Sequence, residues 1–344
     1  MSKDYYLNDS GQFIIENYQK QKNFASFLPG IAGKFGIPIW AFYVNRGQGI
    51  ASFGSSNKDN AIMEFYPANK SYQNVATKGF RTFIKLIEED EVYEAFRDLN
   101  ENISTKMMID SDSLKIEEEN LELGLKTTVN YYILPNEDFG ALVREVEIEN
   151  IGDKTREIEV LDGMPILIPF GMENAALKEV SQTISAWAMV DSFESKTPFY
   201  KLRASAEDEA EVKEMTAGNF YISFEKTADK SEKNRLLTPL VDPDVIFEEK
   251  SSLESALGFE RKELTDYQGE QILENRFPSA MAAVKKELKP GEKLELASVF
   301  GNLADQDRLA EVKDRVLKEN YMQEKRTETK KIHNFYADHI FTVS

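Results

Sequence analysis

The chain has 344 residues, of which 41% are hydrophobic and 30% charged, the composition of an ordinary folded globular protein. Its 60 acidic and 42 basic residues leave a net charge of −18, which repels a phosphate backbone and argues against a nucleic-acid partner. The absence of cysteine excludes disulfides and Cys-type zinc sites. We expect a cytoplasmic protein without a membrane segment, because the start lacks a signal-peptide pattern and no run of eighteen apolar residues occurs.

The most glycine-dense segment, residues 29–36, does not fit a phosphate-binding loop. A Walker loop needs a glycine five residues before Gly33 and a Ser or Thr after Lys34, but Leu28 and Phe35 occupy those positions. We therefore interpret the glycines as turn and close-packing positions.

Residues 39–49 combine aromatic rings with amide and guanidinium donors, the residue types that bind sugars by stacking and by hydrogen bonds to hydroxyls. Trp40 and Phe42 are interpreted as core residues of a strand. The candidate substrate-binding residues at the end of this strand are Tyr43, Asn45, Arg46 and Gln48. The alternative is that the whole segment is a core strand followed by a glycine turn.

Period-two alternation of apolar and polar residues predicts many short strands, with few helices between them. The predicted strands are residues 37–44, 80–87, 113–119, 121–126, 127–134, 144–149, 156–161, 220–224 and 294–300. A turn at 150–154 suggests that the strands on either side of it form a hairpin. Parallel sheets need long crossover connections, so we predict an all-β fold built as a large antiparallel β-sandwich.

Two further side chains are placed by the same patterns. Arg144 shares the parity of Leu142 and Val146, so it is expected to face the covered side of its sheet and to form an ion pair, with a binding role as the alternative. Trp187 lies in an apolar run and is interpreted as a packing residue.

Helical patterns are confined to the second half of the chain. A helix of about ten residues is predicted within 205–217, and 228–234 is predicted to be a surface loop. From Asp305 onward, Leu309, Val312 and Val316 recur at the spacing of an amphipathic helix. We therefore divide the chain into a β-sandwich domain, 1–304, and a helical linker, 305–344, that leads toward a further domain.

The chemistry-bearing residues do not form a recognisable catalytic set. With 60 acidic residues, the sequence gives no basis for choosing a general acid and base. Only two histidines occur, His333 and His339, both in the charged tail, so neither a Ser-His-Asp triad nor a His-based metal site is expected in the β region. Sugar-epimerase chemistry that needs histidine is disfavoured for the same reason. No catalytic residue, metal or cofactor is predicted.

Several segments resemble a known family. These are residues 36–48, 52–54, 63–69, 79–85, 288–293 and 299–301. The first is the most specific, and it resembles the opening of 1,2-β-oligoglucan phosphorylases, which belong with the cellobiose and chitobiose phosphorylases of glycoside hydrolase family 94. The resemblance spans most of the chain but only the N-terminal region of that family.

The resemblance implies a galactose-mutarotase-like supersandwich, then a helical linker, then an (α/α)6-barrel that carries the catalytic Asp and the phosphate site. It further implies an inverting phosphorylase, a glycosyltransferase-type enzyme that uses phosphate to split β-1,2-linked gluco-oligosaccharides and gives glucose 1-phosphate. The complete enzyme would bind glucan and inorganic phosphate and form a homodimer. We expect this chain alone to be inactive. The alternatives are a stand-alone carbohydrate-binding protein and a structural dimerisation domain.

Overall fold

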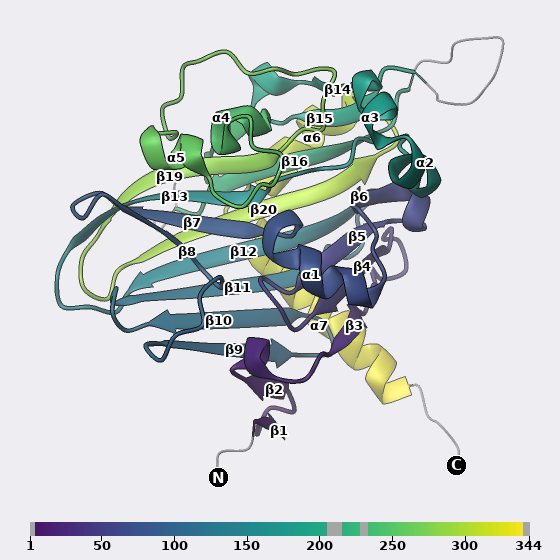
Figure 1. Ribbon diagram of the computed structural model, residues 1–344. Helices are drawn as coiled ribbons and strands as arrows, with labels where there is room; N and C mark the ends of the chain where they lie inside the picture. The colour runs from purple at the N-terminus through teal and green to yellow at the C-terminus, as the bar shows by residue number, and fades with distance from the viewer. Residues whose placement is uncertain (1–3, 205–214, 228–232, 340–344) are drawn as a thin grey trace.

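The computed structural model describes residues 4–204, 215–227 and 233–339. In this part of the chain antiparallel strands form three sheets, and short helices cover their outer faces (Figure 1). The main apolar core is shared between the largest sheet and the two smaller sheets. The predicted all-β antiparallel sandwich is therefore confirmed.

The largest sheet has 11 strands within the described residues. Their order across the sheet is β1, β2, β9, β10, β11, β12, β20, β16, β15, β14, with β17 paired to β16. The strands are β1 (Tyr5–Leu7), β2 (Phe13–Glu16), β9 (Ile103–Ile109), β10 (Leu114–Asn120), β11 (Leu125–Ile133), β12 (Gly140–Asn150), β14 (Ala188–Asp191), β15 (Phe199–Leu202), β16 (Gly218–Glu225), β17 (Arg235–Leu236) and β20 (Lys293–Leu303).

Two smaller sheets complete the β structure. The five-stranded sheet, in spatial order, contains β18 (Pro239–Leu240), β19 (Ala280–Leu288), β13 (Arg156–Met164), β7 (Arg81–Leu86) and β8 (Glu91–Glu94). The four-stranded sheet contains β3 (Ala25–Leu28), β4 (Ile39–Val44), β5 (Ile50–Ser55) and β6 (Ala61–Met63).

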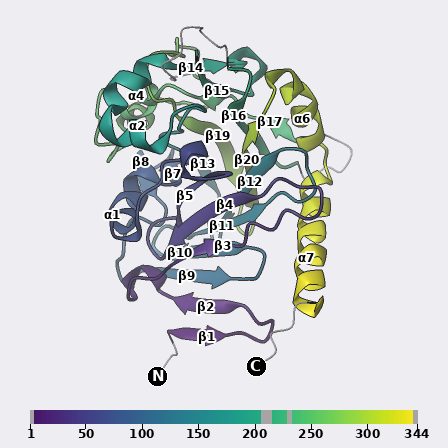
Figure 2. The ribbon, with the colours of Figure 1, turned by 90° about the vertical axis from the view of Figure 1, so that its right-hand side faces the viewer.

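The helices lie on opposite sides of the molecule. One side carries α1 (Ala68–Lys78), α2 (Asn174–Glu179), α3 (Ser181–Ile184), α4 (Pro243–Phe247) and α5 (Leu257–Arg261), and the other carries α6 (Leu309–Val316) and α7 (Tyr321–His339) (Figure 2). Among the described residues, none of these helices combines the length and the apolar character that crossing a membrane requires.

The predicted C-terminal amphipathic helix is confirmed as α6, and its apolar stripe packs on the sandwich. Leu309, Val312 and Val316 are 3%, 0% and 0% exposed, and they share one buried cluster with Val143 and Val299 of the 11-stranded sheet. The role of residues 305–344 as a linker toward a further domain stays a prediction.

The predicted hairpin around residues 150–154 is wrong. Strand β12 pairs with β11 and β20, whereas β13 pairs with β19 and β7, so the connection passes from one sheet to the other. Val146 and Ile148 of β12 and Ile158 and Val160 of β13 all enter the same core from opposite sides. Alternation identifies the buried face of a strand, but it does not identify the strand's neighbour.

Three other predicted elements differ from the structure or lie largely outside its described residues. Residues 121–124 form an exposed turn rather than a strand, because Gly124 takes a left-handed conformation (φ 64°), and β11 begins only at Leu125. The helix predicted within 205–217 and the loop predicted at 228–234 fall largely on residues outside the described part of the chain.

The predicted ion pair of Arg144 is confirmed, and it lies in the centre of the core. Arg144 is fully buried, and its guanidinium group donates to the Asp162 carboxylate, to the Tyr131 hydroxyl and to the side-chain oxygen (Oε1) of Gln48, each at 2.6 Å. Thr82 donates to the same carboxylate at 2.7 Å. A buried charge is tolerated only with such pairing and bonding.

Glu118 is a second buried ionisable group. Its side chain is 1% exposed, and it accepts hydrogen bonds from the Tyr93 hydroxyl and, at 2.7 Å, from the Phe96 backbone N–H. Burial raises the pKa of Glu118 to about 7, and the two hydrogen bonds only partly offset this effect. Glu118 therefore keeps its proton in the folded protein at a pH where the unfolded chain has lost it.

This difference in pKa predicts a pH-dependent stability. Between about pH 4.5 and pH 7 the folded state binds more protons at Glu118, so its contribution to stability falls as pH rises, by up to about 1.4 kcal/mol per pH unit. Glu118→Gln removes the titration, so the variant should gain stability relative to the parent chain from pH 5 to pH 7. Urea titrations at both pH values give the free energy of unfolding of the variant and of the parent chain. If the difference between the two chains is the same at both pH values, the prediction is contradicted.

Candidate functional site

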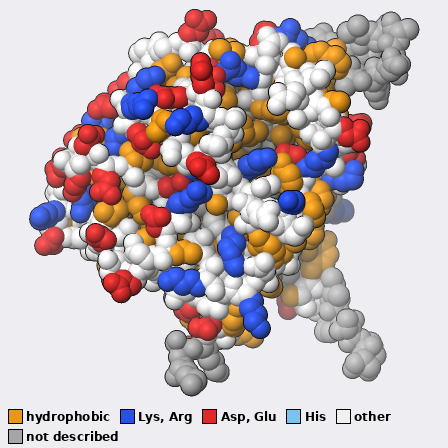
Figure 3. All heavy atoms as spheres, in the orientation of Figure 1, with side chains coloured by type: hydrophobic (Ala, Val, Ile, Leu, Met, Phe, Trp, Pro, Cys, Tyr) orange, Lys and Arg blue, Asp and Glu red, His pale blue; other side chains and the backbone are white. Residues whose placement is uncertain are grey.

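A pocket of about 570 Å³ lies on the side of the molecule that carries α1 to α5. Small-molecule sites commonly have volumes of about 300–1,000 Å³. The surface between α1, α2 and α4 is hollowed, with apolar side chains inside and charged ones around it (Figure 3). The apolar lining includes Ala51, Met63, Val75, Ile166, Ile168, Leu177 and Phe277.

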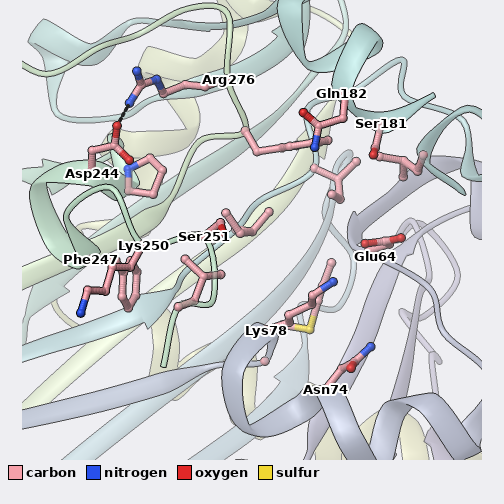
Figure 4. A pocket seen from close by; sticks show the side chains of 18 of the residues that line it. Glu64, Asn74, Lys78, Ser181, Gln182, Asp244, Phe247, Lys250, Ser251 and Arg276 are labelled. Carbon is pink, nitrogen blue, oxygen red and sulfur yellow. Dashed lines mark hydrogen bonds and ion pairs between the residues drawn. The ribbon is translucent and has the colours of Figure 1, made fainter. Parts of the chain in front are cut away.

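The pocket has two polar walls. The first wall comes from the segment between β6 and the end of α1, and from α3. The second comes from α4, the loop after it and the segment before β19 (Figure 4). The first wall contains Glu64, Tyr66, Asn74, Lys78, Ser181 and Gln182; the second contains Asp244, Phe247, Glu248, Glu249, Lys250, Ser251, Asn275 and Arg276.

Local structure fixes the first wall. Pro67, with its fixed φ, precedes α1, and the Ser71 hydroxyl in the first turn donates to the Tyr66 carbonyl at 3.0 Å. The helix ends at Gly79, whose N–H bonds the Val75 carbonyl at 3.0 Å. Tyr66 and Lys78 are thereby brought to the same side of the pocket.

A charged cluster surrounds the Tyr66 ring. The Tyr66 hydroxyl donates to Glu64 Oε2 at 2.5 Å, and Lys178 of α2 forms an ion pair with Glu64 Oε1. The Lys178 ammonium group lies 3.6 Å from the centre of the ring. Burial and the contact with Glu64 raise the pKa of Tyr66, so the phenol keeps its proton.

Lys78 is the cation that this cluster leaves available. Its ammonium group donates to the neutral Tyr66 hydroxyl at 2.9 Å. Among the described residues, no carboxylate lies within 4 Å of the Lys78 ammonium group, the distance limit for an ion pair. A ligand in the pocket can therefore receive hydrogen bonds from Lys78.

The second wall begins at the N-terminus of α4. Asp242 caps this helix by accepting from the Asp244 N–H at 3.1 Å. Arg276 forms ion pairs with Asp242 at 2.9 Å and with Asp244 at 2.5 Å. The Arg276–Asp244 pair lies across the pocket from Lys78 and Asn74 (Figure 4).

The lining suits a neutral ligand with many hydroxyl groups. Carboxylates and cations are nearly balanced, since Glu64, Asp244, Glu248 and Glu249 stand against Lys78, Lys250 and Arg276. Amides and hydroxyls come from Asn74, Ser181, Gln182, Ser251 and Asn275. Of the three rings in the lining, Phe277 is partly exposed, whereas Phe247 is fully buried and the Tyr66 ring lies against Lys178. Rings stack on the apolar faces of sugars, while amides and carboxylates bond to their hydroxyls. In the described part of the chain, no group of three His, Cys, Asp or Glu side chains is arranged to hold a metal ion.

The four predicted substrate-binding residues lie together, but away from this pocket. Tyr43, Asn45 and Gln48 are 3%, 0% and 3% exposed, and Arg46 is partly exposed. Gln48 bonds to Thr82 and Arg144 in the core. Their sugar-binding role stays a prediction, and the structure gives each polar group among Asn45, Arg46 and Gln48 partners within the protein.

Arg46 and Asn45 hold the segment that precedes β3. Arg46 donates to the Gln21 carbonyl at 3.0 Å and to Asn23 Oδ1 at 2.8 Å. Asn45 donates to the carbonyls of Tyr18 at 2.9 Å and Lys22 at 2.8 Å, and its Oδ1 accepts from the Phe24 N–H at 2.8 Å. This end of β4 is thus tied to residues 18–24.

The two tryptophans differ from their expected positions. Trp40 is only partly buried; its ring packs against Phe65 and its Nε1 donates to the Asn57 carbonyl at 3.0 Å. Trp187 is 47% exposed, so its interpretation as a packing residue is wrong. It ends a 3-10 turn before β14, and the apolar run around it does not enter the core as a whole.

Sequence reasoning did not identify the pocket, because its residues come from several stretches that are far apart in the sequence and contain no motif. Two of the segments that carry the family resemblance contribute to the pocket: residues 63–69, with Glu64 and Tyr66, and residues 79–85, with Gly79. The second wall had no signal at all in the sequence.

Comparison with known proteins gives distant structural matches only. The chain is similar to a polysaccharide lyase (13% identity, TM-score 0.45, 81% of this chain and 34% of the lyase). It is also similar to a protein from the human microbiome named as a kojibiose phosphorylase (11%, 0.38, 94% and 32%) and to a galactose mutarotase-like protein from Clostridium acetobutylicum (10%, 0.37, 87% and 97%). The chain thus spans about a third of the first two proteins. No protein-family model and no curated protein matches it.

The bonding of Asn45 predicts a structural contribution that can be measured. Asn45→Ala removes the hydrogen bonds from its fully buried side chain to the carbonyls of Tyr18 and Lys22 and from the Phe24 N–H, each worth about 0.5–1.5 kcal/mol. We expect the free energy of unfolding to fall by at least about 2 kcal/mol in urea titrations. An Asn23→Ala variant, at an exposed site nearby, serves as the control. Equal stability of the two variants would contradict this assignment.

Proposed function

We propose that the chain is the carbohydrate-binding β-sandwich region of a glycoside phosphorylase that splits β-1,2-linked gluco-oligosaccharides with phosphate to give glucose 1-phosphate. The observation that carries the carbohydrate part is the two-walled pocket, with rings, amides, hydroxyls and nearly balanced charges. The linkage and the reaction rest on the resemblance of residues 36–48 and the other segments named above. A cytoplasmic homodimer is part of the same proposal.

In this proposal the chain binds and orients the glucan, and phosphorolysis takes place on residues outside it. The bonding of two pocket carboxylates supports this division of roles. Glu64 is engaged by Tyr66 and Lys178, and Asp244 by Arg276. A general acid must lie within hydrogen-bond reach of the atom that it protonates, and these protein partners already engage oxygens of both carboxylates.

The second candidate function is a stand-alone carbohydrate-binding protein. One observation favours it: both walls and the apolar lining of the pocket come from this chain alone. Sugar affinity is expected under both functions, and phosphate-dependent turnover by a longer protein separates them. A dimerisation domain, the third possibility, requires no sugar affinity.

Binding to defined oligosaccharides tests the carbohydrate part. We expect isothermal titration calorimetry to detect β-1,2-linked glucose di- and trisaccharides, with weaker binding of the β-1,3- and β-1,4-linked isomers. Lys78→Met should weaken binding roughly tenfold, the effect of losing one hydrogen bond to a charged group, without changing the melting temperature. Lys70→Met, on an exposed position of the same helix, is the matched control. Absence of binding by the parent chain, or equal losses in both variants, would refute the pocket assignment.

The division of roles predicts that the purified chain does not catalyse phosphorolysis. Glucose 1-phosphate should not rise above a heat-denatured control when the chain is incubated with β-1,2-glucan and phosphate. Release that depends on both substrates would show that the catalytic groups are in this chain, and it would overturn the proposed non-catalytic role.

A further inference from the structure

The loop between α4 and α5 forms much of the second wall. Glu248, Glu249, Lys250, Ser251 and Leu253 all line the pocket. This loop, residues 248–253, faces the first wall across the cavity (Figure 4). It is called the recognition loop below.

Both ends of the recognition loop have unusual backbone conformations. Glu248 has φ 55° and ψ −161°, a region that is populated almost only by glycine. Leu253 has φ 56°, which is unfavourable for a branched side chain. Such conformations persist only where the surrounding structure over-determines them, and they gather at ligand-binding sites.

Arg81 supplies much of that surrounding structure. Its side chain is 1% exposed and binds both oxygens of Glu94 at 2.6 Å. The same guanidinium group donates to the carbonyl of Leu253 and, at 2.9 Å, to the carbonyl of Glu254. The C-terminal end of the loop is thereby fixed to strands β7 and β8 of the five-stranded sheet.

Two further contacts hold the loop. The Leu253 side chain is 8% exposed and packs in the cluster under α4 and α5. At the other end, both Glu248 oxygens lie 2.8 Å from Arg261 of α5. The loop is therefore anchored at both ends before any ligand arrives.

The middle of the loop is exposed, in contrast to its anchored ends. Glu249, Lys250 and Ser251 are exposed, and among the described residues their side chains make no hydrogen bond or ion pair. Together they offer a carboxylate acceptor, an ammonium donor and a hydroxyl, with no net charge. These groups match the hydroxyls of a neutral sugar better than a phosphate.

We propose that the recognition loop is a preorganised specificity element for a neutral oligosaccharide, and that Arg81 is its positioning residue. This inference rests on the proposed sugar-binding function. Glu249, Lys250 and Ser251 select the ligand, while the strained, anchored ends hold them in place. The cost of ordering the loop is met during folding, so it does not weaken binding.

Relief of the strain provides a test. Glu248→Gly allows the observed backbone without strain but also permits many other conformations. We expect the melting temperature to stay the same or rise. The affinity for the β-1,2-linked trisaccharide should fall at least about fivefold, which corresponds to a loss of about 1 kcal/mol in binding free energy. A purely structural position would not lose affinity while keeping stability. Arg261→Gln removes the ion pair without changing the backbone at Glu248, so it separates loss of this contact from relief of the strain, and its affinity should fall less than that of Glu248→Gly.

A second variant reaches the other end of the loop. Arg81→Lys keeps the charge but loses the fork that joins Glu94 to two carbonyls, so amide hydrogen exchange should speed up at residues 249–254 and affinity should fall. If the parent chain binds the trisaccharide and Glu248→Gly binds it equally well, the inference is overturned while the proposed function stands. If the parent chain binds no oligosaccharide, the proposed function fails and the inference fails with it.

Discussion

The buried pair of Arg144 and Asp162 is the interaction on which the arrangement of the three sheets depends. Arg144 comes from β12 of the 11-stranded sheet, Asp162 from β13 of the five-stranded sheet, and Gln48 from the turn after β4 of the four-stranded sheet. Leaving a charge buried without its partner costs several kcal/mol. We infer that the sheets reach full stability only in the register that brings these groups together, so that the pair selects one packing among the many that apolar strands would allow.

This arrangement places the pocket. Strand β7 carries Thr82 into the buried pair and, one residue earlier, directs Arg81 to the opposite face, where it holds the recognition loop. Adjacent residues of a strand point to opposite faces, so one strand serves both the core and the binding wall. The first wall follows β6 of the four-stranded sheet. This sheet is joined to the same core by Gln48, which lies in the turn between β4 and β5 and bonds to Thr82. The separation of the two walls is thus set by the packing of the sheets.

Much of the fold could be predicted from the sequence, and the failures have physical causes. The strand patterns located β4, β7, β10, β11, β12, β13, β16 and β20, and the spacing of Leu309, Val312 and Val316 located α6, because such patterns report one buried face. The shorter strands β1, β2, β3, β6, β8, β14, β15, β17 and β18 carried too few residues for a pattern. Alternation could not show that β12 and β13 belong to different sheets, since both bury one face in the same core. The sequence could not show that Asn45 and Gln48 have hydrogen-bond partners distant in sequence, and their predicted role in sugar binding stays a prediction. The second wall of the pocket combines ordinary charged loop residues, and only tertiary packing and two unusual backbone conformations distinguish it.

The central claim is that this chain binds a neutral β-linked oligosaccharide in the pocket between the first wall and the recognition loop. A crystal structure of the chain with a β-1,2-linked glucose trisaccharide tests it most directly. The account predicts a sugar ring between Lys78 and Asn74 on one side and Lys250 and Ser251 on the other, with the loop backbone at Glu248 unchanged. Sugar bound instead at the Tyr43–Gln48 end of β4, or at the partly exposed ring of Trp40 with the pocket empty, would contradict it.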